Sequence, residues 1–323
     1  MIFNVGVTGT GSLIGQGIIK SIQNSEYSKN YRLVGFDYFK DTVGSFWCEN
    51  NYVLPDILKK EVTEQDWLDL LVKLIIKEKL DILFIGVDFE LPILATEREA
   101  IKKLTGCHVI VSDKRVIDIG NDKYLTYKFL KENNLNYPET HLVDGLDFSS
   151  LKYPLIIKPR VGARSIGVYK VESEADLRDK IKKVDNPVIQ ELVGNDDTEY
   201  TCGVIFFGDE LKAQIPLRRT LKAGNTAVSE YSSSFSEKIN EYVAQIAVKL
   251  KPFGSCNLQL RVDNNGIPKL FEINPRHSGT TYMRSLFGHN EVIYTLKYLL
   301  EKEETSFTLK EGKALRYYEE KLV

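Results

Sequence analysis

The residue types best suited to chemistry gather in the segment 257–276. Asn265-Gly266 stands there between two stretches of alternating polar and apolar residues, which is typical of a β-hairpin closed by a two-residue turn. Such a turn places Gln259 opposite Glu272, and Asn274 lies two residues further along the same face. The hairpin is therefore expected to bring three oxygen-bearing side chains close together.

These oxygen atoms predict a metal site. The opposite face of the hairpin is expected to be apolar and to consist of Leu258, Leu260, Phe271 and Ile273. Carboxylate and amide oxygens suit Mg²⁺ or Mn²⁺, which keep coordination positions for water and substrate phosphates. Arg276 follows two residues after Asn274, where its guanidinium suits a phosphoryl group. The alternative is a polar hairpin face that simply meets solvent.

A second group of residues points to an anion. An apolar strand ends at Lys158, and a buried ammonium is costly unless an anionic partner lies nearby. The loop 160–167 follows and leads into another strand. Its glycines and cationic donors are Arg160, Gly162, Arg164 and Gly167. Backbone N–H groups and guanidinium groups of such a loop can hold phosphates, although the sequence of a Walker A loop is absent. An ordinary hairpin loop is the alternative.

The first third of the chain alternates strand and helix patterns. The predicted strands are 2–7, 32–36, 81–87 and 108–111, and the predicted helices are 18–22, 67–79 and 94–104. This alternation predicts a doubly wound α/β unit of about 112 residues. Asp88 and Glu90 follow the third predicted strand, at the sheet edge where ligands bind in such folds. Substrate contacts are one interpretation of these two acids and solvated loop acids are the other, and the sequence leaves both open.

Three glycines after the first strand raise the question of a dinucleotide. Gly9, Gly11 and Gly15 separate that strand from a helix, and Asp37 ends the second strand, near the usual ribose position. The spacing is GxGxxxG, a variant of the usual GxGxxG. A tight strand-to-helix turn needs glycine in any case, because glycine tolerates positive φ. The sequence thus leaves a nicotinamide or flavin site open beside a purely structural turn.

Length and composition exclude several classes of protein. The chain has 323 residues, 43 basic and 45 acidic, with a formal net charge of -2. A near-neutral chain lacks the extended basic surface of a nucleic-acid-binding protein. Its four cysteines have no CxxC spacing, so free thiols are expected. No apolar run is long enough for a membrane span and no signal peptide is recognisable, so we expect a cytoplasmic protein.

The motifs occur in a characteristic order along the rest of the chain. An amphipathic helix begins near Lys123, with Asn121 or Asp122 as its N-cap. The ordered set is Lys123, Ile157-Lys158-Pro159 with the glycine loop, Gln190-Glu191-Leu192, Glu199-Tyr200-Thr201, Gln259 and Glu272-Ile273-Asn274-Pro275-Arg276. This set resembles the ATP-grasp superfamily, most closely the branch of the carbamoyl phosphate synthase large subunit and its stand-alone relatives.

The resemblance implies a fold and a division of the chain. The fold is α/β, with a Rossmann-like pre-ATP-grasp domain followed by a two-lobed α+β ATP-grasp fold. The first domain would cover residues 1–112 and the ATP-grasp domain residues 113–303. Within the latter, the small lobe would span about 124–190 and the large lobe about 191–303, leaving a C-terminal tail at 304–323. A pre-ATP-grasp domain generally does not bind NAD.

The resemblance also implies roles for individual residues. The nucleotide-binding residues would be Lys123, Lys158, Arg160, Gly162, Ser165, Gly167, Gln190, Glu191, Leu192 and Glu199. The two lysines would contact the phosphates of ATP, and the glycine loop 162–167 would close over them. The strand 190–193 would form the adenine hinge, with Glu191 and the backbone of Leu192 near the base, and Glu199 would bind the ribose. The metal ligands would be Gln259, Glu272 and Asn274, and the catalytic residues Arg276, Lys158 and Arg219.

The implied reaction is the ATP-dependent activation of a carboxylate. Attack on the γ-phosphate gives an acyl phosphate, from which an amine, ammonia or a thiol displaces phosphate, and no protein nucleophile is needed. Arg219 could clamp a substrate carboxylate. Other candidates for the substrate side are Arg218, Lys222, Asn225, Thr226, the turn 278–281 and Arg284. The expected partners are therefore a small-molecule carboxylate and an amine, with no nucleic acid and no membrane.

Two other functions stay open at this stage. One is a NAD-binding Rossmann protein or oxidoreductase built on the glycine turn, and the other is an ATP-binding subunit of a carbamoyl-phosphate-synthase-like complex. The chain is about a third as long as a full carbamoyl phosphate synthase large subunit, lacks a second ATP-grasp half and shows no glutaminase domain, which argues against carbamoyl phosphate as the native product. The sequence leaves the oligomeric state open, a homodimer included, and also the role of the tail.

Overall fold

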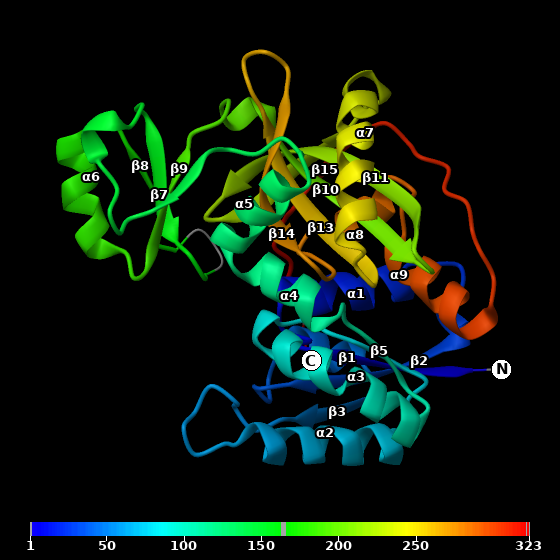
Figure 1. Ribbon diagram of the computed structural model, residues 1–323. Coiled ribbons are helices and arrows are strands. Elements are labelled where there is room, and N and C mark those ends of the chain that lie inside the picture. The colour runs from blue at the N-terminus through cyan, green and yellow to red at the C-terminus, as the bar shows by residue number, and fades with distance from the viewer. Residues whose placement is uncertain (1, 163–165, 321, 323) are drawn as a thin grey trace.

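The chain folds around three β-sheets. A computed structural model describes residues 2–162, 166–320 and 322 (Figure 1). Within that part of the chain, five strands form a parallel sheet, four form a small antiparallel sheet and six form a large antiparallel sheet. The predicted α/β class, with a parallel sheet followed by antiparallel ones, is confirmed.

The parallel sheet comes first in sequence and has the order β3-β2-β1-β4-β5. Its strands are β1 (Phe3–Thr8), β2 (Tyr31–Asp37), β3 (Asn50–Val53), β4 (Ile82–Phe84) and β5 (His108–Ile110). Helices α1 (Leu13–Gln23), α2 (Glu64–Glu78) and α3 (Leu91–Thr105) connect them, with α1 and α2 on opposite faces in Figure 1. The sequence prediction missed β3, because this short edge strand is half-exposed and lacks an apolar run.

The small sheet has the order β6-β9-β7-β8 and stands apart on the left of Figure 1. Its strands are β6 (Thr140–Leu142), β7 (Leu155–Pro159), β8 (Tyr169–Val171) and β9 (Pro187–Glu191). Helix α6 (Glu174–Lys180) covers one face, and Leu177 from it joins Leu155, Ile157 and Val171 in a local core. The other face of the sheet is free to meet the large sheet across a pocket.

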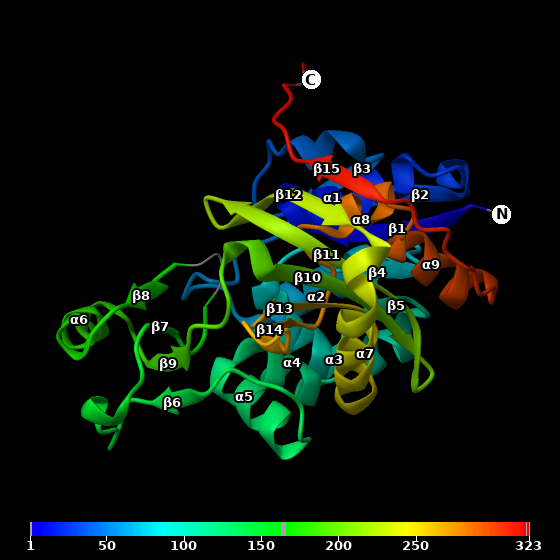
Figure 2. The same ribbon diagram turned by 90° about the horizontal axis from the view of Figure 1, so that it is seen from above.

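The large sheet has the order β14-β13-β10-β11-β12-β15, which can be followed from strand to strand in Figure 2. Its strands are β10 (Glu199–Phe207), β11 (Glu210–Lys222), β12 (Asn225–Tyr231), β13 (Gly254–Val262), β14 (Pro268–Asn274) and β15 (Gly312–Leu315). One face packs on α7 (Ser233–Leu250), α4 (Lys114–Asn121) and α5 (Lys123–Glu132). The opposite face meets α8 (Thr281–Leu286) and α9 (Glu291–Leu296), and Ile205 and Phe207 share a core with β1 and α1.

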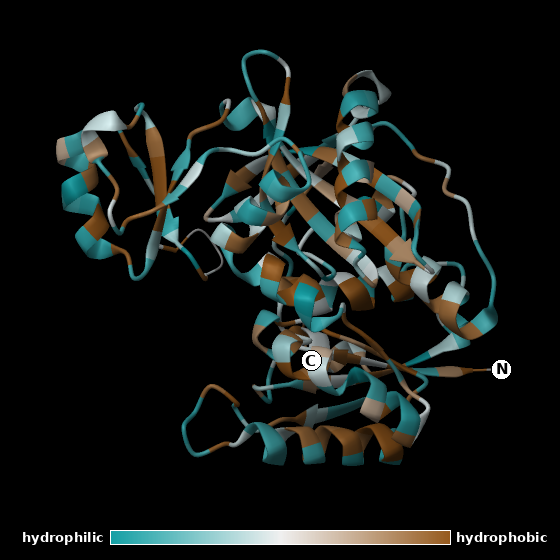
Figure 3. Ribbon diagram, viewed as in Figure 1, coloured by the Kyte–Doolittle hydropathy of each residue, from teal (hydrophilic) through white to brown (hydrophobic). Residues whose placement is uncertain are grey.

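Hydrophobic residues follow this layering. Figure 3 shows brown strands inside the molecule and hydrophilic loops at its edges. All four cysteines are free, as expected, and three of them are buried. No helix in the described ranges is both long and apolar enough to cross a bilayer.

The predicted domain boundaries stay predictions, but two segments pack differently from what was expected. Helix α5 was assigned to the small lobe, yet Phe129 and Leu130 from it lie in the core of the large sheet. Residues 312–315 were assigned to a tail, yet they form β15 at the edge of the large sheet. The first difference arises because apolar side chains of α5 find their partners far along the sequence, and the second because β15 is held by pairing with the distant strand β12.

The hairpin of β13 and β14 has the predicted pairing, but its turn differs from the predicted one. The turn has three residues rather than two: the N–H of Asp263 donates to the carbonyl of Ile267 at 3.0 Å, and Gly266 has a φ of +73°. A bulge further along the hairpin shifts the register by one residue, so that Gln259 still pairs with Glu272 and Asn257 with Asn274. The predicted two-residue turn was wrong, and the bulge compensates for it.

Candidate functional site

One pocket between the small and large sheets collects most of the predicted nucleotide and metal residues. The predicted residues that line it are Lys123, Lys158, Gly162, Gln190, Glu191, Leu192, Glu199, Arg219, Gln259 and Glu272. Ile166 and Val193, which belong to the predicted glycine loop and the predicted hinge, also line it. The lining residues that were not predicted are Pro138, Ile156, Pro159, Val168, Leu221, Arg261 and Phe271. The pocket thus has cationic, acidic and apolar walls, as a site for a small charged ligand with an apolar ring requires.

Lys158 is the buried cation of this pocket. It lies near the end of β7 and is only 5% exposed. Its Nζ donates to Gln190 Oε1 at 2.7 Å, and the Phe271 ring lies 5.5 Å away. Burial, with some repulsion from Lys123, lowers the pKa of Lys158 to about 7, although Glu272 opposes the change. A ligand phosphate would supply the negative charge that the ammonium lacks.

Lys123 lies in the same pocket at the first turn of α5. Asp122 caps this helix by accepting from Tyr124 N at 2.9 Å, which confirms one of the two predicted N-caps. The Nζ of Lys123 donates to the carbonyl oxygen of Gly162 at 2.9 Å, which ties the helix to the start of the glycine loop. Burial lowers the pKa of Lys123, partly offset by Glu272. The pocket therefore holds two desolvated ammonium groups with little compensating charge.

A hydrogen-bonded row crosses the large sheet on the pocket side. Arg219 Nη2 lies 2.7 Å from Glu199 Oε1, and it donates to Gln259 Oε1 at 2.6 Å. Arg261 binds the other carboxylate oxygen of Glu199, with Nη2 at 2.7 Å. Glu199 is 5% exposed, so two guanidinium groups neutralise one buried carboxylate. This row holds Gln259 and Arg219 in fixed orientations.

A second row runs from the β13–β14 hairpin to the loop after β4. Asn274 Nδ2 donates to Glu272 Oε1 at 3.0 Å, and Asn274 Oδ1 accepts from Arg276 Nη2 at 3.0 Å. The Nε of Arg276 in turn lies 2.6 Å from Asp88 Oδ1. Carboxylate, amide and guanidinium therefore stand in line, and Asp88 carries the line across to the loop after β4.

The predicted metal set fits a divalent cation that also binds a substrate phosphate. Glu272 supplies one carboxylate and Gln259 and Asn274 supply amide oxygens, which is the oxygen-rich donor set that Mg²⁺ uses together with phosphates. No cluster of three or more His, Cys, Asp or Glu side chains suited to a metal occurs in the described ranges. With one carboxylate and two amides as protein donors, phosphate oxygens of the ligand would complete the coordination.

In the predicted adenine hinge, the carboxylate of Glu191 is engaged in contacts within the protein. Glu191 Oε1 lies 2.7 Å from Lys269 Nζ, and Glu191 Oε2 accepts from the backbone N–H of Glu139 at 3.1 Å. The side chain thus fastens β9 to β14 and to the segment before β6. The backbone of Leu192 and the apolar side chains of Ile156 and Phe271 remain to face a base.

Phe271 is the extra residue of the β14 bulge. The sequence prediction placed it on the apolar face of the hairpin, which was wrong. Strict alternation would send Phe271 to the side opposite Glu272, but the bulge breaks the alternation and both residues line the pocket. Only a bulge signal could have revealed this, and the sequence carries none.

Several predicted nucleotide contacts lie elsewhere or cannot be placed. Arg160 lies outside the pocket lining, and its Nε lies 2.7 Å from Asp122 Oδ2. Gly167 is not part of the lining either, whereas the neighbouring Ile166 is. Ser165 and the second candidate donor, Arg164, lie outside the described residues.

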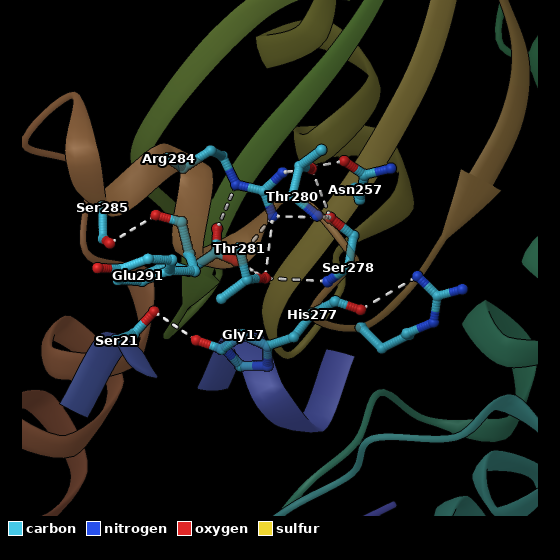
Figure 4. A network of polar contacts seen from close by, with 12 residues as sticks. Gly17, Ser21, Asn257, His277, Ser278, Thr280, Thr281, Arg284, Ser285 and Glu291 are labelled. Atoms are coloured by element: carbon cyan, nitrogen blue, oxygen red, sulfur yellow. Dashed lines mark hydrogen bonds and ion pairs between the residues drawn. The ribbon is translucent and has the colours of Figure 1, made fainter. Parts of the chain in front are cut away.

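Arg284 was a candidate for substrate binding, and the structure gives it another role. It is fully buried, and its Nη2 lies 2.7 Å from Oε1 of the equally buried Glu291. Figure 4 shows its guanidinium at the centre of a network. The other acceptors are Asn257, Ser278, Thr280 and Thr281. Every nitrogen of the guanidinium is engaged, so Arg284 fixes the turn 278–281 to β13 and is not free for a ligand.

The remaining substrate-side candidates are dispersed. Arg218 Nη2 pairs with Glu230 at 2.6 Å on the large sheet. Lys222 and Asn225 are exposed at the β11–β12 connection, and Thr226 is buried. Of the predicted groups on the substrate side, Arg219 lines the pocket, and Arg276 lies beside the hairpin residue Asn274.

The glycine turn of the first sheet is filled by the protein itself. Asp37 Oδ2 accepts from the N–H of Gly11 at 2.7 Å and from Thr10 Oγ1 at 3.1 Å. The short helical turn Val43–Trp47 packs on the same spot, where a Cβ on Gly44 would lie 1.9 Å from the carbonyl oxygen of Thr10. A dinucleotide would need both the N–H of Gly11 and the carboxylate of Asp37, and internal bonds already use them. This geometry argues against the oxidoreductase alternative.

The two loop acids after β4 differ from each other. Glu90 is fully buried and accepts from Thr8 Oγ1 and from the Tyr38 hydroxyl, the latter at 2.7 Å. Burial raises the pKa of Glu90 to about 7, and the charge of Asp37 adds to this. Glu90 thus anchors the loop through internal hydrogen bonds and is not a solvated acid. Asp88 is about half-exposed and reaches Arg276.

Comparisons with known proteins agree with this architecture. Residues 188–321 match the family described as ATP-grasp in the biosynthetic pathway with Ter operon. The carbamoyl phosphate synthase large chain of Campylobacter jejuni is 26% identical over 250 residues, which are 71% of this chain but 22% of that protein. The chain therefore spans about a fifth of the length of that relative.

Two further relatives are ligases. A D-alanine–D-alanine ligase of Clostridium botulinum is 25% identical over 236 residues, covering 63% of this chain and 76% of that protein. The crystal structure of an L-amino acid ligase from Bacillus licheniformis superposes with a TM-score of 0.73 at 17% identity, covering 93% of this chain and 74% of that one. The chain thus has the fold of these ligases, and its residues 188–321 match an ATP-grasp family.

Proposed function

We propose that the protein is an ATP-dependent carboxylate–amine ligase. The observation that carries this proposal is the convergence in one pocket of two desolvated lysines, Lys123 and Lys158, with the hairpin carboxylate Glu272. Two buried ammonium groups require a polyanion, and a carboxylate beside them requires a cation bound to that polyanion. A nucleoside triphosphate with its divalent metal supplies both.

Nucleotide binding follows from the walls of the pocket. The adenine ring would lie between Ile156 and Phe271, against the backbone of Leu192. The phosphates would lie toward Lys123 and Lys158 and toward the backbone of Gly162. Glu199 would bind the ribose only by sharing its carboxylate with the two arginines that hold it, so positioning these arginines is its second role.

Mg²⁺ would be held by Glu272 together with Gln259 and Asn274, and it would neutralise phosphate charge during transfer. Gln259 Oε1 already accepts from Arg219, so the metal would use the second lone pair of that oxygen. Asn274 is held between Glu272 and Arg276, so it also aligns the arginine with the metal site.

The reaction needs two steps on these groups. A carboxylate oxygen of the acid attacks the γ-phosphorus of ATP, the bond to the bridging oxygen breaks, and ADP leaves with that electron pair. The nitrogen of the amine then attacks the acyl carbon, phosphate leaves, and the nitrogen loses a proton to give the amide. Arg276 and Lys158 would stabilise the charge that develops on the phosphoryl oxygens, and Arg219 would orient the acid.

The main competing function is an ATP-binding subunit of a larger synthetase. The retained lysines and the retained hairpin carboxylate favour a catalytic chain over a decayed one. The reaction places the protein where ATP is made, so we expect it in the cytoplasm, with small molecules rather than nucleic acid or a membrane as partners. A homodimer stays a hypothesis.

The test is ADP release from ATP and Mg²⁺ with a panel of carboxylates and amines. We expect release to require one acid and one amine together, and Glu272→Gln to reduce it at least about 100-fold, because phosphoryl transfer depends on the metal. A matched control is Glu49→Gln, which removes an exposed carboxylate that pairs with Arg32 outside the pocket. ADP release by Glu272→Gln at the rate of the unmodified protein would refute the metal assignment.

A further inference from the structure

Strand β15 brings one more arginine to the substrate side of the large sheet. Its residue Ala314 pairs with Ser229 of β12, and Ser229 pairs with Arg219 of β11. Arg316 continues this pairing, since its N–H donates to the carbonyl of Ala227 at 2.8 Å. Side chains alternate along a strand, so Arg316 faces the same side as Ala314 and Arg219. Two strand spacings, about 10 Å, separate β15 from β11.

The side chain of Arg316 ends at the turn that follows Arg276. Its Nη2 donates to the carbonyl oxygen of Gly279 and lies 3.7 Å from Met283 Sδ. The turn itself is fixed from the other side by the Arg284 network shown in Figure 4. Arg316 therefore lies at a rigid rim of the substrate side, away from the nucleotide pocket.

This guanidinium differs from the other arginines of the chain. Among the arginines that the structure describes, all but two have a carboxylate within 4.0 Å. The two exceptions are Arg316 and Arg115, and Arg115 is exposed. Among the described arginines, Arg316 is thus the one that is partly buried and has no carboxylate within 4.0 Å.

The chemistry of the group explains why this matters. A guanidinium has five N–H donors, and the contacts of Arg316 occupy one nitrogen. Desolvation without a facing carboxylate lowers the pKa of Arg316. Burying a cation is costly unless a nearby anion compensates its charge. A planar guanidinium matches a carboxylate or a phosphate through paired hydrogen bonds.

We propose that Arg316 binds a second anionic group of a substrate, at the end remote from the reacting carboxylate or amine. The substrate class is then an acid or an amine that carries an additional carboxylate or phosphate, such as a dicarboxylate, a phosphorylated acid or an amino acid used as acceptor. This inference rests on the proposed function for the reaction, but the binding of the anion does not require turnover.

Equilibrium binding tests the proposal directly. The midpoint of thermal unfolding is measured with glutarate, with a phosphorylated monocarboxylate and with butyrate, each in the presence of ADP and Mg²⁺. We expect the doubly anionic ligands to stabilise the unmodified protein and butyrate not to. Arg316→Met should weaken their binding about 10- to 100-fold, as expected for loss of a charged hydrogen-bonded contact. Comparing the stabilisation by glutarate with that by the phosphorylated acid shows whether a carboxylate or a phosphate binds more tightly at Arg316.

Two controls separate binding from folding. Arg115→Met removes the other arginine that lacks a carboxylate, outside the pocket lining, and should leave anion binding unchanged. Binding of ADP and Mg²⁺ to Arg316→Met should match the unmodified protein, which shows that the nucleotide site is intact. For the amine substrate, the same thermal measurement compares glycine, which carries a carboxylate, with methylamine, which does not.

Turnover gives the second readout. With an active pair of substrates, Arg316→Met should raise KM for the doubly anionic substrate about tenfold or more and change kcat little, because Arg316 does not line the nucleotide pocket. The inference is overturned if none of these anions and no amino acid stabilises the unmodified protein, or if Arg316→Met binds them as the unmodified protein does. Failure of every acid and amine to release ADP would instead refute the proposed function.

Discussion

The buried pair of Arg284 and Glu291 gives the sharpest prediction about stability. Both side chains are 0% exposed, with Nη2 and Oε1 2.7 Å apart (Figure 4). Glu291→Gln keeps the shape of the side chain and leaves Arg284 as an uncompensated buried charge. Removing one partner of a buried ion pair costs about 3–5 kcal/mol. We expect a loss of that size in the free energy of unfolding.

The pKa of Glu291 leads independently to a similar magnitude. Although burial alone would raise it, the charge and hydrogen bonds of Arg284 lower the pKa from 4.5 to about 2. At ~1.36 kcal/mol per pH unit, this difference corresponds to about 3 kcal/mol. Because the folded-state pKa is the lower one, the stabilisation is fully present above about pH 4.5 and is lost as the pH falls toward 2.

The assay is denaturant-induced unfolding of the unmodified protein and of Glu291→Gln across this pH range. The difference between them should be constant near neutral pH and shrink below about pH 4.5. Asp118→Asn is the matched control, because it removes an exposed ion pair with Lys114 (2.6 Å; side chains 64% and 46% exposed) and should cost less than about 0.5 kcal/mol. A loss of less than about 1 kcal/mol for Glu291→Gln near neutral pH would refute the reasoning from burial.

Three further predictions concern the site and the first domain. Lys158 has a pKa of about 7 in the nucleotide-free protein, so its charge is complete below that pH, and Lys158→Met should weaken ATP binding most near pH 6. The measurement is the ratio of the dissociation constants for ATP of the variant and the unmodified protein, in which the titration of ATP itself cancels. This ratio should fall as the pH rises, and a ratio independent of pH would contradict the prediction. Asp88→Asn should change stability by less than about 1 kcal/mol, because Asp88 is half-exposed, but should lower kcat for ADP release by freeing Arg276, and an unchanged kcat would remove Asp88 from the site. Gly44→Ala should destabilise the first domain, since its Cβ would meet a carbonyl oxygen at 1.9 Å. Gly17→Ala, whose Cβ would have its nearest neighbour at 3.5 Å, should be neutral or stabilising in its helix. Equal midpoints of thermal unfolding for the two variants would contradict this.

Much of the fold could be predicted because its signals are local. The four predicted strands of the first sheet are buried apolar runs, and each helix between them repeats apolar residues with helical spacing. The short strand β3 has no such run, and its place beside β2 depends on pairing that no local pattern encodes. The edge strand β15 was missed for the same reason, since it is held by its partner β12 rather than by its own side chains.

The site shows the same division. The pairing of Gln259 with Glu272 was predicted correctly, but from a two-residue turn that the structure lacks, and the bulge restores the register. Alternation could not reveal that Phe271 turns into the pocket, because a bulge depends on how two strands fit together rather than on the residues of one strand. The buried Lys158 was predicted from an apolar strand ending in lysine, but its partner Gln190 comes from a different strand.

By itself, the sequence determined which residues have the chemistry for nucleotide and metal binding, and the order in which they follow one another. Only the tertiary structure decided how their charges are balanced. Arg276 meets Asp88 across 188 positions of sequence, Glu199 is shared by Arg219 and Arg261, and Arg284 is matched by Glu291, whereas Arg316 has no described carboxylate beside it. Charge compensation depends on distances of a few ångström between residues far apart in the chain, and such distances exist only after the sheets have packed together.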